Sequence, residues 1–205
     1  SELFSSERFD ELKDKIERAA QVMLALTIPI AIVAGVVLQP AMQAFLGLDP
    51  VDTMRVVDVS RIYLIGIVGH SIAELFVRSF YAFQKPKYPL IGAVATLISF
   101  ILISLVLSPA FQARGIAAAN TLSYSFMSLL LLFLLNPFLS FKLNLSKSLI
   151  RGLLGAVLGG AVAFVVLTFV PQISGTFIGA IAGGALGLVV AAFVIRPELV
   201  KLRQL

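Results

Sequence analysis

YLIGIVGHSIAELFVRSFYAF, residues 63–83, is the stretch that decides the fold class of this chain. Such a run is long enough to cross a membrane, for which a helix needs about 20 mostly apolar residues. Within it, His70, Glu74 and Arg78 recur four residues apart. Each step of four residues turns a helix by only about 40°, so the three side chains share one stripe. Ionisable groups at bilayer depth are costly, and we expect this stripe to face inward and line a polar pathway.

The composition extends this prediction to the whole chain. Its 205 residues are 59% hydrophobic and 13% charged, with a mean hydropathy of +1.01, far more apolar than a soluble domain. Six apolar runs are long enough to span a membrane, and they are continuous, whereas barrel strands alternate polar and apolar residues. The sequence therefore predicts an all-α integral membrane protein with six transmembrane helices, at 19–39, 62–83, 89–107, 115–135, 149–170 and 176–195.

The distribution of Lys and Arg predicts the orientation. Twelve of them lie in the N-terminal segment, in alternate loops and in the tail: Arg8, Lys13, Lys15, Arg18, Lys85, Lys87, Lys142, Lys147, Arg151, Arg196, Lys201 and Arg203. Of the remaining loops, the first holds Arg55 and Arg61, the third holds Arg114, and the fifth holds none. We expect Asp49, Asp52 and Asp58 in an external loop. Since cytoplasmic loops are rich in Lys and Arg, both termini are predicted to be cytoplasmic.

Several function classes are not expected. The chain has no Cys and one His, so it offers no thiolate nucleophile and no cluster of histidines for a metal. It contains no phosphate-binding GxxxxGK[ST] motif and no GxSxG motif. The net charge of +5 is spread over membrane-flanking loops. We therefore expect neither an enzyme nor a nucleic-acid-binding protein, and no cofactor or metal.

Three segments are expected along the chain. Residues 1–18 carry apolar residues at helical spacing and predict an amphipathic cytoplasmic helix, 19–140 hold four of the spans, and 141–205 form a terminal hairpin with a cytoplasmic tail. Small residues at intervals of four in the hairpin predict close helix packing: Gly155, Gly159, Gly175, Gly179, Gly183 and Gly187. In the fourth span, Asn120 and Thr121 are interpreted either as polar packing or as an ion site.

RSFYAFQKPKYP, residues 78–89, resembles the corresponding turn of the MurJ-type lipid II flippases, the MviN branch of a superfamily that includes the MATE exporters. The matching residues are Arg78, Phe80, Tyr81, Ala82, Lys87 and Pro89, and GIAAANTLS at 115–123 agrees with a later helix of that family. Lys85 and Tyr88 depart from its pattern, as does a third span with Thr96, Ser99 or Ser104 in place of an Asn. The resemblance implies the last six helices of a two-lobe protein with fourteen, whose arginine cluster lies mostly in upstream helices.

The resemblance also implies a function. It suggests a flippase that moves a lipid-linked saccharide, lipid II, across the cytoplasmic membrane of a bacterium by alternating access, coupled to a cation, H⁺ or Na⁺. In that mechanism Arg78 would meet the pyrophosphate, Glu74 would serve as counter-charge or proton carrier, and His70 would titrate nearby. The glycine hairpin would border a groove for the lipid tail.

Other interpretations stay open. Glu74 and Arg78 are equally consistent with a pair that simply neutralises its own charges along one helix. The protein as a whole is also compatible with a MATE-like exporter of small molecules or drugs, or a flippase for polysaccharide-linked lipids. A further possibility is a membrane scaffold that binds a partner through its basic loops. Because the sequence starts without Met, we expect upstream helices of the same protein to be the partners of this lobe.

Overall fold

The computed structural model describes residues 2–47, 49–138, 143–169 and 176–201. Its helices are α1 (Glu2–Leu46), α2 (Pro50–Ala82), α3 (Lys87–Phe111), α4 (Ala113–Leu135), η1 (Asn136–Phe138), α5 (Ser146–Phe169), α7 (Thr176–Val194) and α8 (Arg196–Lys201). Six of these helices are long and apolar enough to cross a membrane, and the described ranges contain no strand. The predicted all-α membrane architecture is confirmed, with one long helix for each of the six apolar runs.

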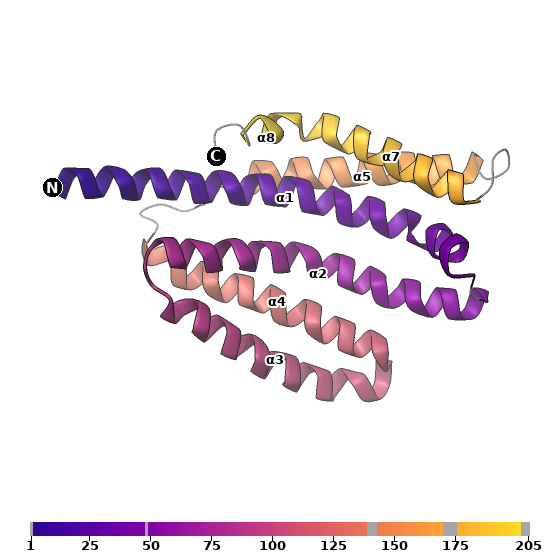
Figure 1. Ribbon diagram of the computed structural model, residues 1–205, viewed down its shortest axis with the longest axis horizontal. Coiled ribbons are helices and arrows are strands. Elements are labelled where there is room, and N and C mark those ends of the chain that lie inside the picture. Colours follow the sequence, from indigo (N-terminus) through magenta and orange to yellow (C-terminus); the bar gives the residue numbers. More distant parts are fainter. Residues whose placement is uncertain (1, 48, 139–142, 170–175, 202–205) are drawn as a thin grey trace.

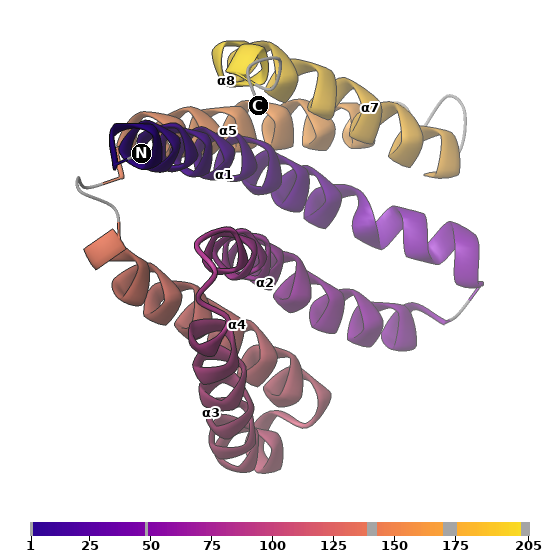
Figure 2. The same cartoon turned by 60° about the vertical axis from the view of Figure 1, so that its left-hand side comes forward.

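Helix α1 lies between two groups of helices (Figure 1). On one side, α4 packs against both α2 and α3, while on the other side α5 and α7 form a hairpin. Helix α1 contacts α2 as well as both helices of the hairpin, and Figure 2 shows the two groups diverging from it. Helix α8 and the first half of α1 lie at the same end of the bundle, as an even number of crossings requires (Figure 1). The division at residue 140 into two segments stays a prediction.

The start of α2 differs from the expected external loop. Asp49 caps the helix, because its carboxylate accepts hydrogen bonds from the backbone N–H groups of Val51 and Asp52, at 2.8 and 2.9 Å. Pro50 occupies the first helical position, where its missing N–H has no cost. The expectation of a loop is therefore wrong for Asp52 and Asp58, which lie in α2. The hydrogen bonds from Asp49 stabilise the first turns of α2 as a helix although their residues are polar.

The turn that carries the family resemblance is built from aromatic side chains. Phe80 is fully buried, and its ring stacks on that of Tyr88 with centroids 4.9 Å apart. Phe138 packs edge-on against both rings, at 6.1 and 5.5 Å. Lys87 places its Nζ 5.1 Å from the centre of the Tyr88 ring. These residues join the end of α2 to the start of α3, so the motif shapes a turn.

Candidate functional site

Two hollows lie on opposite faces of α2. His70 lines one of them and Arg61 the other. These residues are nine positions apart in the sequence, which turns a helix by about two and a half turns and puts their side chains on opposite sides. Helix α2 therefore carries an imidazole on one face and a guanidinium on the opposite face. Each face meets a different pair of helices.

The first hollow lies between α2, α3 and α4 and is called here the polar hollow. It has a volume of about 380 Å³ and is lined by His70, Glu74, Ala93, Thr96, Leu97, Phe100, Asn120, Ser123, Tyr124 and Met127. The ring of His70 packs edge-on against that of Tyr124, with centroids 4.3 Å apart. Two residues of the predicted stripe, His70 and Glu74, are thus brought together with Asn120. Arg78, the third residue of the stripe, is not among the lining residues.

The ion pair between Glu74 and Arg78 lies at the surface of the described residues. Arg78 Nε donates to Glu74 Oε1 at 3.0 Å, and the two side chains are 75% and 49% exposed. This ion pair therefore does not face the packed interior of the described helices, although Glu74 also borders the polar hollow. Charged side chains at bilayer depth face protein or water, so we expect this surface to be covered by protein or to border water.

Ser123, one of several polar residues in the fourth predicted span, differs from its neighbours in its hydrogen bonding. Its side chain is 1% exposed, and its Oγ has no hydrogen-bond partner among the described residues. Serines in helices usually bond to a carbonyl of the preceding turn, as Ser125 and Ser128 do here at 2.8 Å. A buried hydroxyl without such a bond is costly. Ser123 therefore places a buried hydroxyl, unpaired among the described residues, beside the polar hollow.

Thr121 has a different role from its neighbour Asn120. Thr121 Oγ1 donates to the carbonyl oxygen of Ile62 at 2.9 Å, so it links α4 to α2. A Cβ built at Gly66 would lie only 2.6 Å from Thr121 Oγ1, which explains why α2 has a glycine at this position. Of the two interpretations of this pair, the geometry of Thr121 fits packing, whereas Asn120 lines the hollow.

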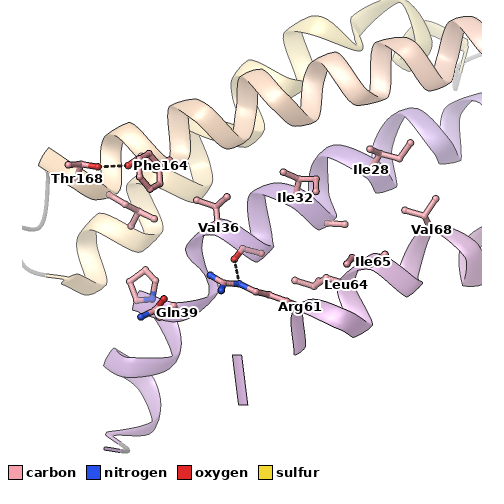
Figure 3. Close-up of a pocket in the computed structure, with 14 residues that line it drawn as sticks. Ile28, Ile32, Val36, Gln39, Arg61, Leu64, Ile65, Val68, Phe164 and Thr168 are labelled. Atoms are coloured by element: carbon pink, nitrogen blue, oxygen red, sulfur yellow. Dashed lines mark hydrogen bonds between the residues drawn. The ribbon is translucent and has the colours of Figure 1, made fainter. Parts of the chain in front are cut away.

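The second hollow lies between α1, α2 and α5 and is called here the apolar groove. Its volume is about 910 Å³, and it is lined by Ile28, Ala31, Ile32, Gly35, Val36, Gln39, Pro40, Arg61, Leu64, Ile65, Val68, Phe164, Leu167 and Thr168. Figure 3 shows the side chains of α1, α2 and α5 that line this groove. The one charged lining residue is Arg61, whose Nε donates to the carbonyl oxygen of Gly35 at 3.0 Å. Sequence reasoning had counted Arg61 only as a loop cation.

The glycines of the hairpin bring α5 and α7 into backbone contact. A Cβ at Gly159 would lie 2.6 Å from the carbonyl oxygen of Gly187, and a Cβ at Gly187 equally close to that of Gly159. A Cβ at Gly183 would lie 3.0 Å from the oxygen of Ala163, and one at Gly155 would meet Ile195 at 3.3 Å. Gly179 is buried, and Gly175 lies outside the described residues.

None of these glycines lines the apolar groove, to which the hairpin contributes Phe164, Leu167 and Thr168 instead. The role of the glycines in holding a lipid tail stays a prediction.

A buried ionic cluster joins the hairpin to α1. Glu198 of α8 has a side chain that is 1% exposed and pairs with Arg151 of α5, at 2.7 Å, and with Lys201. Lys201 Nζ also donates to Gln21 Oε1 of α1, at 2.6 Å. Burial acts to raise the pKa of Glu198, but the hydrogen bonds from Lys201 and Arg151 outweigh it and lower this pKa. Sequence reasoning had interpreted both cations as orientation signals.

Metal-binding chemistry has no evident donor set in the part of the chain that the structure describes. There, no group of three or more His, Cys, Asp or Glu side chains is arranged to hold a metal ion. The polar hollow offers one carboxylate, one imidazole, an amide and hydroxyl groups. Its oxygens suit a proton or a small hard cation, and one imidazole alone makes no transition-metal site.

Comparison with known proteins agrees with the residues of the turn. A family model described as lipid II flippase MurJ matches residues 1–195. No curated protein matches the chain. The family match spans all six long helices and confirms the resemblance seen at residues 78–89, so this chain belongs to the lipid II flippase MurJ family.

Proposed function

We propose that this chain is the C-terminal part of a flippase that carries lipid II, a lipid-linked peptidoglycan precursor, across the bacterial cytoplasmic membrane by alternating access. The family match over residues 1–195 is the observation that carries this proposal. Alternating access requires two groups of helices around a central substrate site. Upstream helices of the same protein supply the second lobe and an arginine cluster. The exposed ion pair of Glu74 and Arg78 marks the face that meets them.

The orientation follows from the basic residues. With both termini in the cytoplasm, the turn between α2 and α3 is cytoplasmic and carries Lys85 and Lys87. The start of α2, with Arg55 and Arg61, then faces the outer side of the membrane. The shared location of α8 and the first half of α1 supports this arrangement (Figure 1).

The apolar groove takes part of the lipid tail. A prenyl or acyl chain has no hydrogen-bonding groups, and the groove presents aliphatic side chains from three helices (Figure 3). From Ile28 to Gln39 the groove follows α1 for roughly 16 Å, about half the thickness of the hydrocarbon core. This length supports a groove within one leaflet. The tail then stays in apolar surroundings while the polar headgroup crosses between the lobes.

The polar hollow takes the coupling cation, H⁺ or Na⁺. Glu74 supplies a carboxylate, and Asn120 and the unpartnered hydroxyl of Ser123 supply neutral oxygens within the same space. If the cation is a proton, Glu74 carries it, with the ring of His70 in the same hollow. Occupancy of this hollow would favour one arrangement of α2, α3 and α4 over another, which is how ion binding drives a conformational equilibrium.

Transport of lipid II is tested with the full-length protein in liposomes. A headgroup-labelled lipid II on the inside should become accessible to an impermeant quencher outside only when the protein is present. An imposed gradient of the coupling ion should accelerate this exposure. Normal export of a cationic dye with no movement of lipid II would refute the flippase proposal and favour the exporter alternative.

The cation site is tested with a matched pair of serines. Ser123→Ala removes the unpartnered hydroxyl from the polar hollow, whereas Ser128→Ala removes a buried hydroxyl that bonds to its own helix. We expect Ser123→Ala to raise the ion concentration needed for half-maximal rate about threefold to tenfold, and Ser128→Ala to leave it unchanged. The same half-maximal ion concentration in both variants would show that Ser123 does not contribute to the cation site.

A further inference from the structure

We propose that Arg61 binds a phosphate group of the lipid-linked substrate at the outer end of the apolar groove, where the lipid leaves the protein. This inference rests on the proposed function, because it places the lipid tail in the apolar groove. Arg61 is far along α2 from the predicted stripe and on the opposite face. It would define a release-side site distinct from the polar hollow.

The depth of Arg61 fits a headgroup phosphate. Helix α2 ends at Ala82, and from Arg61 to that residue it rises by roughly 30 Å, which is the thickness of the hydrocarbon core. With Ala82 at the cytoplasmic surface, Arg61 reaches the level of the outer headgroups. Gln39, near the end of α1, lines the same groove and adds a polar amide. A lipid lying here would meet polar groups at the outer end and aliphatic side chains below them.

Arg61 also differs from other arginines in its partners. Arg55, Arg78, Arg114 and Arg151 each pair with a carboxylate, at 3.0, 3.0, 2.6 and 2.7 Å. No carboxylate among the described residues pairs with Arg61, although its side chain is partly buried beside an apolar groove. A partly desolvated cation without an anion is unfavourable unless a ligand supplies the negative charge. A phosphate at the membrane surface is the anion that this location offers.

The orientation of the side chain leaves it able to bind. Among the described residues, Arg61 uses only Nε, in the hydrogen bond to the carbonyl oxygen of Gly35. Figure 3 shows the side chain reaching from α2 toward α1 on the side of Gln39. The two terminal amino groups of a guanidinium form a fork that matches two phosphate oxygens. The hydrogen bond to Gly35 thus fixes the side chain and leaves its two terminal amino groups to bind a ligand in the groove.

A purely structural role predicts a different outcome. If Arg61 serves only to tie α2 to the backbone of α1, a neutral hydrogen-bond donor should replace it, and lipid binding should not depend on phosphate. Arg61→Gln keeps a side-chain N–H donor and removes the charge, and Arg61→Lys keeps the charge without the fork. Arg55→Gln is the matched control, because Arg55 is exposed at the same end of α2 and pairs with Asp52.

The experiment compares binding of two lipids to the purified full-length protein by native mass spectrometry: undecaprenyl pyrophosphate and undecaprenol, which share a tail and differ in phosphate. We expect Arg61→Gln to weaken binding of the pyrophosphate lipid about tenfold and to change binding of the alcohol less than twofold. Arg61→Lys should fall between Arg61→Gln and the native protein, and Arg55→Gln should match the native protein.

The outcomes separate this inference from the proposed function. Equal loss of both lipids, or no loss of either, would overturn the role of Arg61 while native flipping of lipid II continued to support the function. If phosphatidylglycerol displaced the pyrophosphate lipid at equal concentration, the site would belong to ordinary anionic lipids, and the inference would be wrong. Failure of the native protein to move lipid II would instead overturn the function itself. Thermal unfolding of each variant checks that it is folded.

Discussion

The polar hollow and the apolar groove share helix α2 but differ in almost every property that matters for transport. The hollow is small, about 380 Å³, and collects a carboxylate, an imidazole and an unpartnered hydroxyl. The groove is more than twice as large, about 910 Å³, and is lined by aliphatic side chains with one arginine. A single helix thus separates a small space with ionisable and polar groups from a larger, mostly aliphatic one. Any tilt of α2 would change both at once.

The largest effect is expected when α5, which forms one side of the apolar groove, is displaced from its partner helix α7. Gly187→Leu puts a side chain where a Cβ already lies 2.6 Å from the carbonyl oxygen of Gly159, so α5 and α7 must separate. Overpacking of this kind costs about 1–3 kcal/mol or more. We expect a marked fall in the thermal unfolding temperature and in expression. Leu186→Ala, at an exposed neighbour, is the control and should have little effect; similar unfolding temperatures for both variants would contradict the packing described here.

The second test concerns only the polar hollow. Glu74→Gln keeps the shape of the side chain and removes its charge, so we expect lipid II flipping to lose its dependence on the coupling ion and to slow by on the order of tenfold or more. Arg78→Gln should change the rate far less, because an exposed ion pair contributes roughly 0–1 kcal/mol and Arg78 does not line the hollow. The rates are measured in liposomes with and without an ion gradient. A Glu74→Gln protein that is normally expressed and still flips at the native rate would show that this carboxylate has no part in coupling.

The third test sharpens the role of the apolar groove. Ile32 lines the groove, whereas Ile30 does not, although the two side chains are 45% and 44% exposed on the same helix. Ile32→Trp should fill part of the groove and slow flipping of a long-chain lipid about fivefold, with a smaller effect on a short-chain analogue. Ile30→Trp should affect neither. If the two variants slow both lipids equally, the groove is not a tail site.

The smallest expected effect concerns the ionic cluster that fixes the hairpin beside the groove. The pKa of Glu198 is lowered in the folded protein from its ordinary value of 4.5. The ionised carboxylate therefore contributes stability that is complete above that value and is lost as the pH falls through the lowered pKa. We expect the unfolding temperature of the native protein to fall by a few degrees between about pH 5 and pH 3. In Glu198→Gln the same change of pH should lower it less; an identical pH dependence would show that Glu198 is not the titrating group.

Sequence reasoning predicted the helices well because each span is a continuous apolar run, and length alone identifies it. It failed at the start of α2. There the polar residues Asp52, Arg55 and Asp58 indicated a loop, but Asp49 and Pro50 begin a helix locally. Local capping does not depend on hydrophobicity, so a search for apolar runs does not detect it.

The candidate site was predictable only in part. The spacing of His70 and Glu74 predicted one stripe, and both residues line the polar hollow, whereas Arg78 does not. Their role in transport stays a prediction. The apolar groove was not predictable, because aliphatic residues on α1, α2 and α5 look the same whether they touch each other or leave a space. Arg61 and Lys201 were counted for orientation alone, since their partners Gly35 and Gln21 are distant in the sequence.

The position of α1 between the two helix groups has a consequence for biosynthesis. Pro29 and Val33 are buried against glycines of a hairpin that the ribosome makes much later. The hydrogen bond between Gln21 and Lys201 can form only after Lys201 has been synthesised, 180 residues later. During synthesis one face of α1 is therefore in contact with lipid, or with a helper protein, until the hairpin is made. Because glycines make the contacts of the hairpin with Pro29 and Val33, the two later helices can pack closely against α1 once they are made.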